Sequence, residues 1–268
     1  MLGGAALISE AMNRLWDDFF VRPISEFGRF TTFFLEGVKR CMVPMIDRRL
    51  LLRQMEFVGN RSLGIVVIAG TLVGVIFGLI LGNIFRRFGT ESLLGAATGI
   101  SLTKEVAPVF CGFLVTARAG SAMAAEIGTM RVNEQIDAMR IMSVNPYSYL
   151  VAPRILAASL VMPLLNCVFV LVGSVAAYGV AVAFYDVDTG VFIEKMRWLV
   201  RPAYLTQGMQ KSAVFGLLIA SIGCFRGFYA GGGAKGVGKA TTEAVVASLV
   251  AILIADFFVS YLQFDKFL

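Results

Sequence analysis

Five long apolar stretches dominate this chain and limit what it can fold into. They run over about Ser62–Phe85, Ser92–Ala117, Arg154–Phe184, Tyr204–Tyr229 and Thr241–Phe264. Each is longer than the roughly 18 apolar residues that a helix needs to cross a bilayer. The sequence therefore predicts an all-α, polytopic integral membrane protein with five transmembrane helices.

The composition agrees with this class and argues against several others. Charged residues make up 16% of the chain, where a soluble domain carries about 25%. Histidine is absent, which removes the commonest metal ligand and general base. The four cysteines are scattered without a C-x-x-C spacing, so they indicate neither a zinc site nor a disulfide framework. We expect no metal site and no catalytic residue in this chain, and an intramembrane enzyme is the least favoured class.

Basic residues are distributed unevenly between the two sides of the predicted spans. Sixteen Lys and Arg lie in the segment 1–61 and in the loops that share its side, against six on the other side. Positively charged segments stay in the cytoplasm. We therefore expect a cytoplasmic N-terminus and a C-terminus on the far side of the membrane, and we attribute the net charge of +6 to topology and anionic lipid rather than to nucleic acid.

The segment 1–61 mixes aromatic and charged residues and differs from the spans that follow it. This mixture is typical of amphipathic helices that lie in the headgroup region. We divide the chain into this N-terminal region and a transmembrane domain, 62–264. Two alternatives stay open, namely a cytoplasmic arm packed on the rest of the chain and a dip of Phe33–Met45 into the membrane.

The stretch GGGAKGVGKATT, 231–242, nearly spells a nucleotide-binding P-loop. Gly233, Gly238 and Lys239 fit the pattern G-x-x-x-x-G-K-[ST], but Ala240 stands where a hydroxyl would hold Mg²⁺. The stretch also follows an apolar span rather than a strand. We expect a flexible positive loop here, so any ATP must be hydrolysed by another chain.

Two threonines follow this loop. Thr241 and Thr242 precede the last apolar stretch, and threonine is a favoured residue at helix N-termini. We expect one of them to cap the last transmembrane helix.

The first span carries glycines at every fourth position, which form one stripe along a helix: Gly70, Gly74, Gly78 and Gly82. Such a stripe lets the backbone of another helix approach closely, so we assign it to helix packing. The opposite face carries Leu72, Ile76 and Leu79. That face could meet lipid, a partner subunit or an apolar substrate.

Four charged residues lie well inside the spans, away from their ends, where burial costs roughly 2.5–3.5 kcal/mol on insertion scales. Lys211 and Asp256 lie on consecutive antiparallel helices, both about 12 Å below the outer end, which predicts an intramembrane ion pair. Lys104 and Glu105 precede Pro108 in the second span, and Glu105 could join the same network. The network could be a structural clamp, could move during transport, or could relay protons.

The connection between the second and third spans contains a predicted amphipathic helix, Arg131–Met142, which ends before Pro146. Its apolar residues recur at i, i+4 and i+7, and its charged residues face away. A short cytoplasmic helix of this kind could lie in a groove of a partner protein. The alternative is a loop helix that packs on its own subunit.

The same connection resembles the signature of the MlaE/YrbE family, the permease subunits of ABC transporters that work with MCE proteins. Four stretches carry the resemblance: Ala117–Arg154, Gln54–Val66, Leu102–Val109 and Gly233–Val246. The second-span motif of the family usually reads L-x-R-E-L-G-P-V, and here Lys104 replaces the Arg and Ala107 the Gly. The resemblance covers about 54–262, whereas the first fifty residues are much less diagnostic.

The resemblance implies a homodimeric phospholipid permease of the inner membrane, with a separate ATPase subunit below it and a periplasmic MCE protein above it. ATP and Mg²⁺ would bind the ATPase, and this chain would carry no cofactor. The segment 118–147 would transmit the motion of the ATPase, with these coupling residues: Glu126, Met130, Val132, Glu134, Ile136, Asp137 and Met139. Glu105, Lys211 and Asp256 match the intramembrane charges of the family.

We expect two copies to enclose an outward-facing apolar cavity for lipid. Its expected lining residues are Leu72, Ile76, Leu79 and Leu93. Two other classes of function stay open: an ion- or proton-coupled secondary transporter of an apolar substrate, and a membrane scaffold that transports nothing. Against the secondary transporter, the five spans show no internal repeat.

Overall fold

The structure is a computed structural model that describes residues 22–41 and 47–264. Within these ranges every regular element is a helix, so the all-α prediction is confirmed. The α-helices are α2 (Arg22–Cys41), α3 (Arg48–Val58), α4 (Asn60–Arg87), α5 (Leu94–Ser101), α6 (Ala107–Val115), α7 (Ser121–Val132), α8 (Gln135–Ile141), α9 (Ala152–Tyr185), α10 (Thr189–Leu199), α11 (Pro202–Phe228) and α12 (Gly233–Phe264). A 3₁₀ turn, η2 (Glu91–Leu93), and three π-helical segments, η3 (Leu102–Val106), η4 (Thr116–Gly120) and η5 (Tyr147–Val151), join some of them.

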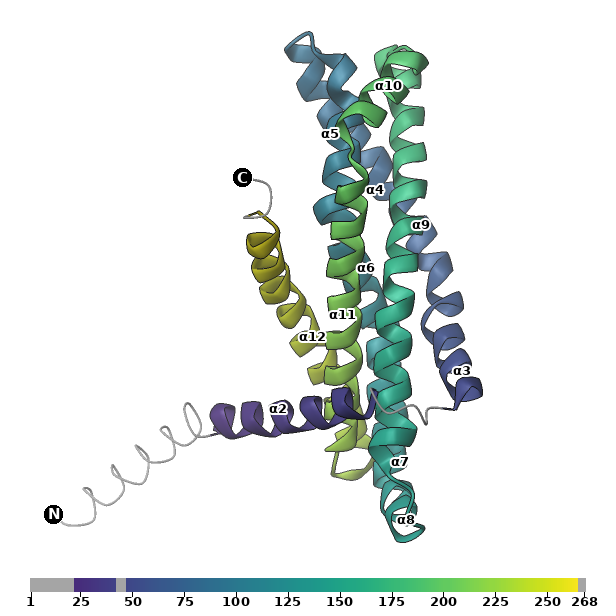
Figure 1. The fold of residues 1–268 in the computed structure, drawn as a ribbon, viewed down its shortest axis with the longest axis vertical. Coiled ribbons are helices and arrows are strands. Elements are labelled where there is room, and N and C mark those ends of the chain that lie inside the picture. Colours follow the sequence, from purple (N-terminus) through teal and green to yellow (C-terminus); the bar gives the residue numbers. More distant parts are fainter. Residues whose placement is uncertain (1–21, 42–46, 265–268) are drawn as a thin grey trace, which may run out of the picture.

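Five segments of the described chain are long and apolar enough to cross a membrane, as predicted: Arg48–Arg87, Glu91–Val132, Tyr147–Tyr185, Pro202–Phe228 and Gly233–Gln263. The second combines α5 to α7 and their π-helical joints into one long rod that extends past the bundle. Figure 1 shows the rods side by side, with α2 lying across one end near α8 and with α10 at the opposite end.

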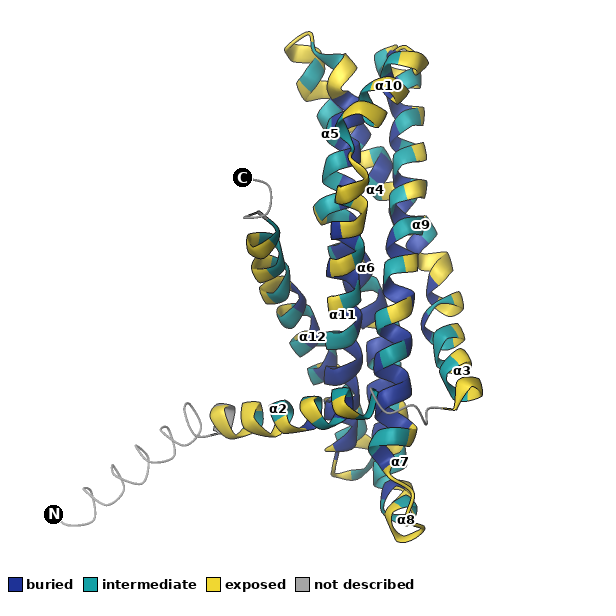
Figure 2. Ribbon diagram, in the orientation of Figure 1, coloured by how far each residue is buried: buried dark blue, intermediate teal, exposed yellow. Residues whose placement is uncertain are grey.

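Helices α9 and α11 form the centre of the bundle, and α12 lies at its edge. Two thirds of the apolar window of α11 are buried, against 11% of that of α12. Figure 2 shows many buried residues in α9 and α11, while much of α12 is exposed. The outer surface of α12 therefore faces lipid or another chain.

The glycine stripe of α4, predicted as a helix-packing face without a named partner, packs against α9. Gly70, Gly74, Gly78 and Gly82 are all buried. A Cβ added to Gly74 would lie 2.2 Å from the carbonyl oxygen of Gly173, and one added to Gly82 would lie 2.2 Å from the Tyr185 ring. Only glycine permits this approach of the two backbones.

The π-helical segment η3 ends at Val106, two residues before Pro108. Proline lacks an N–H group, and its ring clashes with the carbonyl group one turn earlier in a regular α-helix. A widened turn relieves that clash, and such π-bulges are frequent at functional sites. Gly208 of α11 packs on this widened turn, because a Cβ there would lie 2.3 Å from the carbonyl oxygen of Thr103.

Helix α2 packs on the bundle through its second half, as the alternative of an arm packed on the rest of the chain requires, whereas its interfacial position stays a prediction. Ile24 and Phe27 in its first half are exposed, whereas Phe33 is buried and its ring contacts Phe225 and Phe228. The dip predicted as an alternative for Phe33–Met45 falls partly outside the described residues. The part up to Cys41 continues the single helix α2.

Two expectations about the helix limits are wrong. Helix α12 begins at Gly233, so Thr241 and Thr242 lie inside it and their hydroxyl groups donate to Val237 and Gly238 carbonyl oxygens. The positive loop is therefore the first two turns of a helix, and neither threonine is a cap. Tertiary packing overrides the low helix propensity of glycine here.

Helix α10 was not predicted from the sequence. Its N-cap is Asp188, whose carboxylate accepts a hydrogen bond from the Val191 N–H group. An aspartate at this position is a recognisable N-cap signal in a sequence. The helix was missed because the charged residues of α10 are typical of a loop between two spans. Its Phe192 is buried.

Candidate functional site

Lys211 lies at the centre of an intramembrane charge cluster. Its side chain is 1% exposed, and its Nζ lies 2.6 Å from Glu105 Oε2 and 3.0 Å from Asp256 Oδ1. It also donates a hydrogen bond to Ser260 Oγ at 2.6 Å. The predicted ion pair of Lys211 and Asp256 is present, and Glu105 joins it.

The local structure explains how these groups meet. Gly208, one turn before Lys211, brings α11 against η3, the widened turn that carries Glu105. Asp256 and Ser260 lie one turn apart on α12 and so share one face of that helix. Three spans are thus joined through one ammonium group.

The cluster contains one cation and two carboxylates. Glu105 is 49% exposed and Asp256 is 21% exposed, whereas Lys211 is fully enclosed. Asp256 Oδ1 is within ion-pair distance but makes no hydrogen bond, so its carboxylate has remaining capacity as an acceptor. Because few residues of α12 are buried, this cluster is a specific contact that ties the C-terminal half of α12 to the bundle.

Lys104 points to a different neighbour. Its ammonium nitrogen lies 5.0 Å from the centre of the Tyr204 ring on α11, a cation–π distance. Lys104 and Glu105 therefore contact two different positions of the same helix.

The segment predicted as one amphipathic helix, Arg131–Met142, is two helices in the structure. Helix α7 ends at Val132, and α8 begins at Gln135. Between them Glu134 has a left-handed backbone with φ of 58°, which breaks a helix. The prediction of a continuous helix is wrong because no glycine or proline marks this turn.

Charged side chains fix the turn between α7 and α8. The Arg131 guanidinium donates to both carboxylate oxygens of Asp137, at 2.7 and 2.8 Å. Arg154 of α9 donates to Glu126 of α7 at 3.0 Å, which ties the segment to the central helix. Glu134 itself is exposed.

The predicted apolar stripe faces its own bundle. Ile136 is fully buried, and Met130 and Met139 pack against the core, while Val132 is half-buried. The alternative, a helix packed on its own subunit, therefore holds for this stripe. The outward apolar residues are Ile141 at 84% exposure, Met142 at 66% and Val144 at 40%. The run I-M-S-V after Arg140 was the feature of the sequence that could have predicted these outward apolar residues.

The four expected lining residues lie on the outer surface of the single chain. Leu72, Ile76 and Leu79 are exposed on α4, opposite its glycine stripe, and Leu93 of η2 is also exposed. A cavity lined by these residues therefore needs a second surface to close it.

The P-loop-like stretch has a different geometry from a nucleotide-binding loop. It follows helix α11, turns at Gly232 and Gly233 with φ of 84° and 68°, and continues as α12. Lys239 stands on the helix and contacts Glu243 at 3.8 Å. A P-loop joins a strand to a helix, so this stretch has another role.

Comparison with known proteins agrees with this architecture. The sequence model of the family described as Permease MlaE matches residues 51–262. A probable ABC transporter permease protein of Synechocystis is 39% identical over 87% of this chain and 89% of its own length. Another from Rickettsia felis is 38% identical over 88% of this chain and 92% of its own.

A plant relative extends the comparison. The chloroplastic protein TRIGALACTOSYLDIACYLGLYCEROL 1 of Arabidopsis thaliana is 37% identical over 83% of this chain and 64% of its own length. The chain is an integral membrane protein of the MlaE permease family, whose members named here include ABC transporter permeases.

Proposed function

We propose that this chain is the membrane subunit of an ABC transporter that moves phospholipid between the inner membrane and the outer envelope. A separate ATPase subunit drives it, and a periplasmic MCE protein continues the lipid path. The observation that carries the lipid assignment is the exposed apolar face of α4, which includes Leu72 and Ile76.

A homodimer would turn this face into a chamber. The outer faces of α4 and α12 are apolar and little buried within one chain. The opposite side of α4, which carries the glycine stripe, is already packed against α9. Two copies that place these faces opposite each other would shelter acyl chains, with about 0.8 kcal/mol for each buried CH₂ group. The family match supports this arrangement.

The ATPase would contact the outward residues of the coupling segment. Ile141 and Met142 project from the end of α8, where an apolar groove of a partner could bury them. The pair of Glu126 and Arg154 would pass motion from this segment to α9. ATP and Mg²⁺ would bind the ATPase subunit, with no cofactor in this chain.

The charge distribution supports an orientation in the inner membrane. The end with α2 and α8 (Figure 1) contains most of the basic residues and would face the cytoplasm. The opposite end, with α10, would face the periplasm and the MCE protein. Helix α12 would bring the C-terminus to this outer side.

Reconstituted vesicles test the proposal. The chain, its ATPase and its MCE protein would transfer labelled phospholipid to acceptor vesicles only with ATP, and vanadate would stop the transfer. Omission of the ATPase is the control. Transfer that continues without the ATPase but stops when a proton gradient is collapsed would contradict the proposal and favour a proton-coupled carrier.

A further inference from the structure

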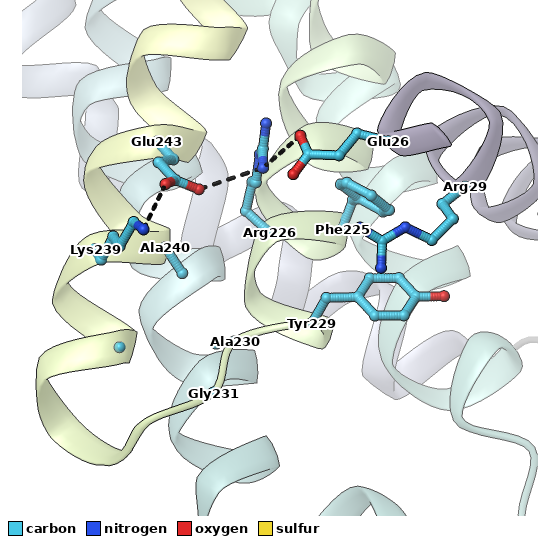
Figure 3. Close-up of a pocket in the computed structure, with 11 residues that line it drawn as sticks. Glu26, Arg29, Phe225, Arg226, Tyr229, Ala230, Gly231, Lys239, Ala240 and Glu243 are labelled. Carbon is cyan, nitrogen blue, oxygen red and sulfur yellow. Dashed lines mark hydrogen bonds and ion pairs between the residues drawn. The ribbon is translucent and has the colours of Figure 1, made fainter. Parts of the chain in front are cut away.

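Two adjoining hollows lie where α2 crosses the hairpin of α11 and α12. The first has a volume of about 320 Å³ and is shown in Figure 3 with its charged side chains. The second has a volume of about 310 Å³ and lies beside it. Glu26, Phe225 and Arg226 line both hollows, so the two share a wall.

The first hollow contains charges of both signs. Arg29, Arg226 and Lys239 bring three cations, and Glu26 and Glu243 bring two carboxylates. Arg226 Nη1 lies 3.3 Å from each carboxylate, between α2 and α12. Figure 3 shows the Arg29 guanidinium over the Tyr229 ring, with 5.7 Å between its central carbon and the ring centre.

The second hollow is mainly apolar, apart from Glu26 and Arg226 in the shared wall, and lies deeper along the helices. Its wall adds Phe27 and Phe30 of α2, Ile222 of α11 and Ala247 of α12. Ile222 and Ala247 are each about one helical turn, roughly 5 Å, farther from the connecting loop than Arg226 and Glu243. A polar compartment near the loop thus continues into an apolar compartment within the span.

The glycine-rich stretch forms one side of the polar compartment. Gly231 and Gly236 line it, and a Cβ added to Gly236 would lie 1.6 Å from the Gly231 carbonyl oxygen. The stretch that resembles a P-loop thus shapes a charged hollow at the membrane surface.

We propose that these two hollows together bind one glycerophospholipid with an amine-bearing, zwitterionic headgroup. The lipid comes from the leaflet on the α2 side, which is the cytoplasmic leaflet in the proposed orientation. Its phosphate binds among Arg29, Arg226 and Lys239, its ammonium group meets Glu26 and Glu243, and an acyl chain occupies the apolar hollow. This lipid joins α2 to the α11–α12 hairpin and is separate from any lipid carried on the α4 face.

Native mass spectrometry of the full-length chain in mild detergent, without an ATPase, tests this site. We expect dioleoylphosphatidylethanolamine to bind the wild type at least tenfold more tightly than the double variant Arg29→Gln/Lys239→Gln. Lys235→Gln removes an exposed cation of the same stretch that does not line either hollow, and it should bind as the wild type does. Equal binding by the double variant would overturn the proposal, as would an equal loss in Lys235→Gln.

A second variant separates lipid binding from folding. Ala247→Trp fills the apolar hollow and leaves all five charges in place, so it should also lose phosphatidylethanolamine while it elutes as a single species. Retained binding in this variant would overturn the acyl-chain assignment.

Two competitors identify the ligand. Dioleoylphosphatidylglycerol should bind more weakly, because it offers no ammonium group to Glu26 and Glu243, and inorganic phosphate at millimolar concentration should not displace the lipid. Displacement by phosphate would show a free-anion site instead. A further measurement checks for a second chain. A photoreactive amino acid placed at position 27 that cross-links two copies in lipid-free protein would show that a second chain covers the hollows. Either result would overturn the proposal.

Discussion

The Lys211 ammonium lies 3.0 Å from the Asp256 carboxylate and joins α11 to α12, the least buried of the five spans. Replacement of Lys211 by Met should leave Asp256 and Glu105 without their cation. Loss of one partner from a buried pair costs about 3–5 kcal/mol; since Glu105 is half exposed, we expect the lower end of that range. Thermal unfolding in detergent should show a clear fall in the melting temperature.

Neutralising the two carboxylates provides the control for Lys211→Met. The triple variant with Asp256→Asn and Glu105→Gln should regain most of the lost stability, because no charge is left unpaired. Exchange of Lys211 and Asp256 should restore less, since it places an aspartate beside Glu105. A triple variant as unstable as Lys211→Met would contradict the view that the charge cluster stabilises the packing of α12 on α11.

Gly74 and Gly173 bring the backbones of α4 and α9 together. Gly74→Ala should destabilise the protein by about 1–3 kcal/mol, because its Cβ would overlap the Gly173 carbonyl and the helices must separate. Gly64→Ala on the same helix is the matched control, since its Cβ would have no neighbour within 4 Å. Similar melting temperatures for the two variants would show that the stripe does not determine this packing.

Ile141 and Met142 are the outward apolar residues of the coupling segment. Burial of such a side chain in a partner contributes about 1.5–3 kcal/mol, so Met142→Asp should lower the affinity for the ATPase about tenfold or more. Copurification of the ATPase with the tagged chain measures this. Glu194→Gln, an exposed polar residue of α10 at the opposite end of the molecule, should copurify normally, and an unchanged yield with Met142→Asp would place the contact elsewhere.

Cys41 of α2 tests the packing of this helix on the bundle. Burial raises the pKa of its thiol to about 11, and its Sγ lies 3.5 Å from the Ala152 carbonyl oxygen as a donor. Only the thiolate reacts with maleimide, so labelling should be slow at pH 8 and should rise with pH up to about 11. The thiol introduced by Val144→Cys, on an exposed position, should reach its maximum more than one pH unit lower. Equal rates for both thiols between pH 7 and 9, read from labelled peptides, would mean that α2 is detached.

The sequence predicted those features of the fold that can be read from the residue pattern within a single span. Hydropathy located the five spans, and the four-residue spacing identified the packing face with Gly74. The depth of Lys211 and Asp256 followed from counting turns, because the two residues lie on consecutive helices that run in opposite directions. These features need no knowledge of the neighbouring helices beyond their order.

The features that the sequence did not reveal depend on contacts between segments. Ile136 belongs to an apolar stripe, but only the position of α8 on the bundle shows that the stripe faces inward and that Ile141 faces outward. The break at Glu134 depends on the Arg131–Asp137 contact rather than on a turn residue. The start of α12 at Gly233 depends on packing that outweighs the poor helix propensity of a glycine-rich stretch.

Photo-crosslinking of lipid from Leu72 tests the central claim that paired copies form a lipid chamber worked by an ATPase. A photoreactive amino acid at Leu72, on the α4 face, should capture labelled phospholipid in vesicles that contain the ATPase, and trapping the ATPase with ATP and vanadate should sharply reduce the yield. The same probe at Leu171, an exposed residue on α9, should capture bulk lipid equally in both states. A yield at Leu72 that is zero, or that stays equal to the yield at Leu171 in every nucleotide state, would contradict the account.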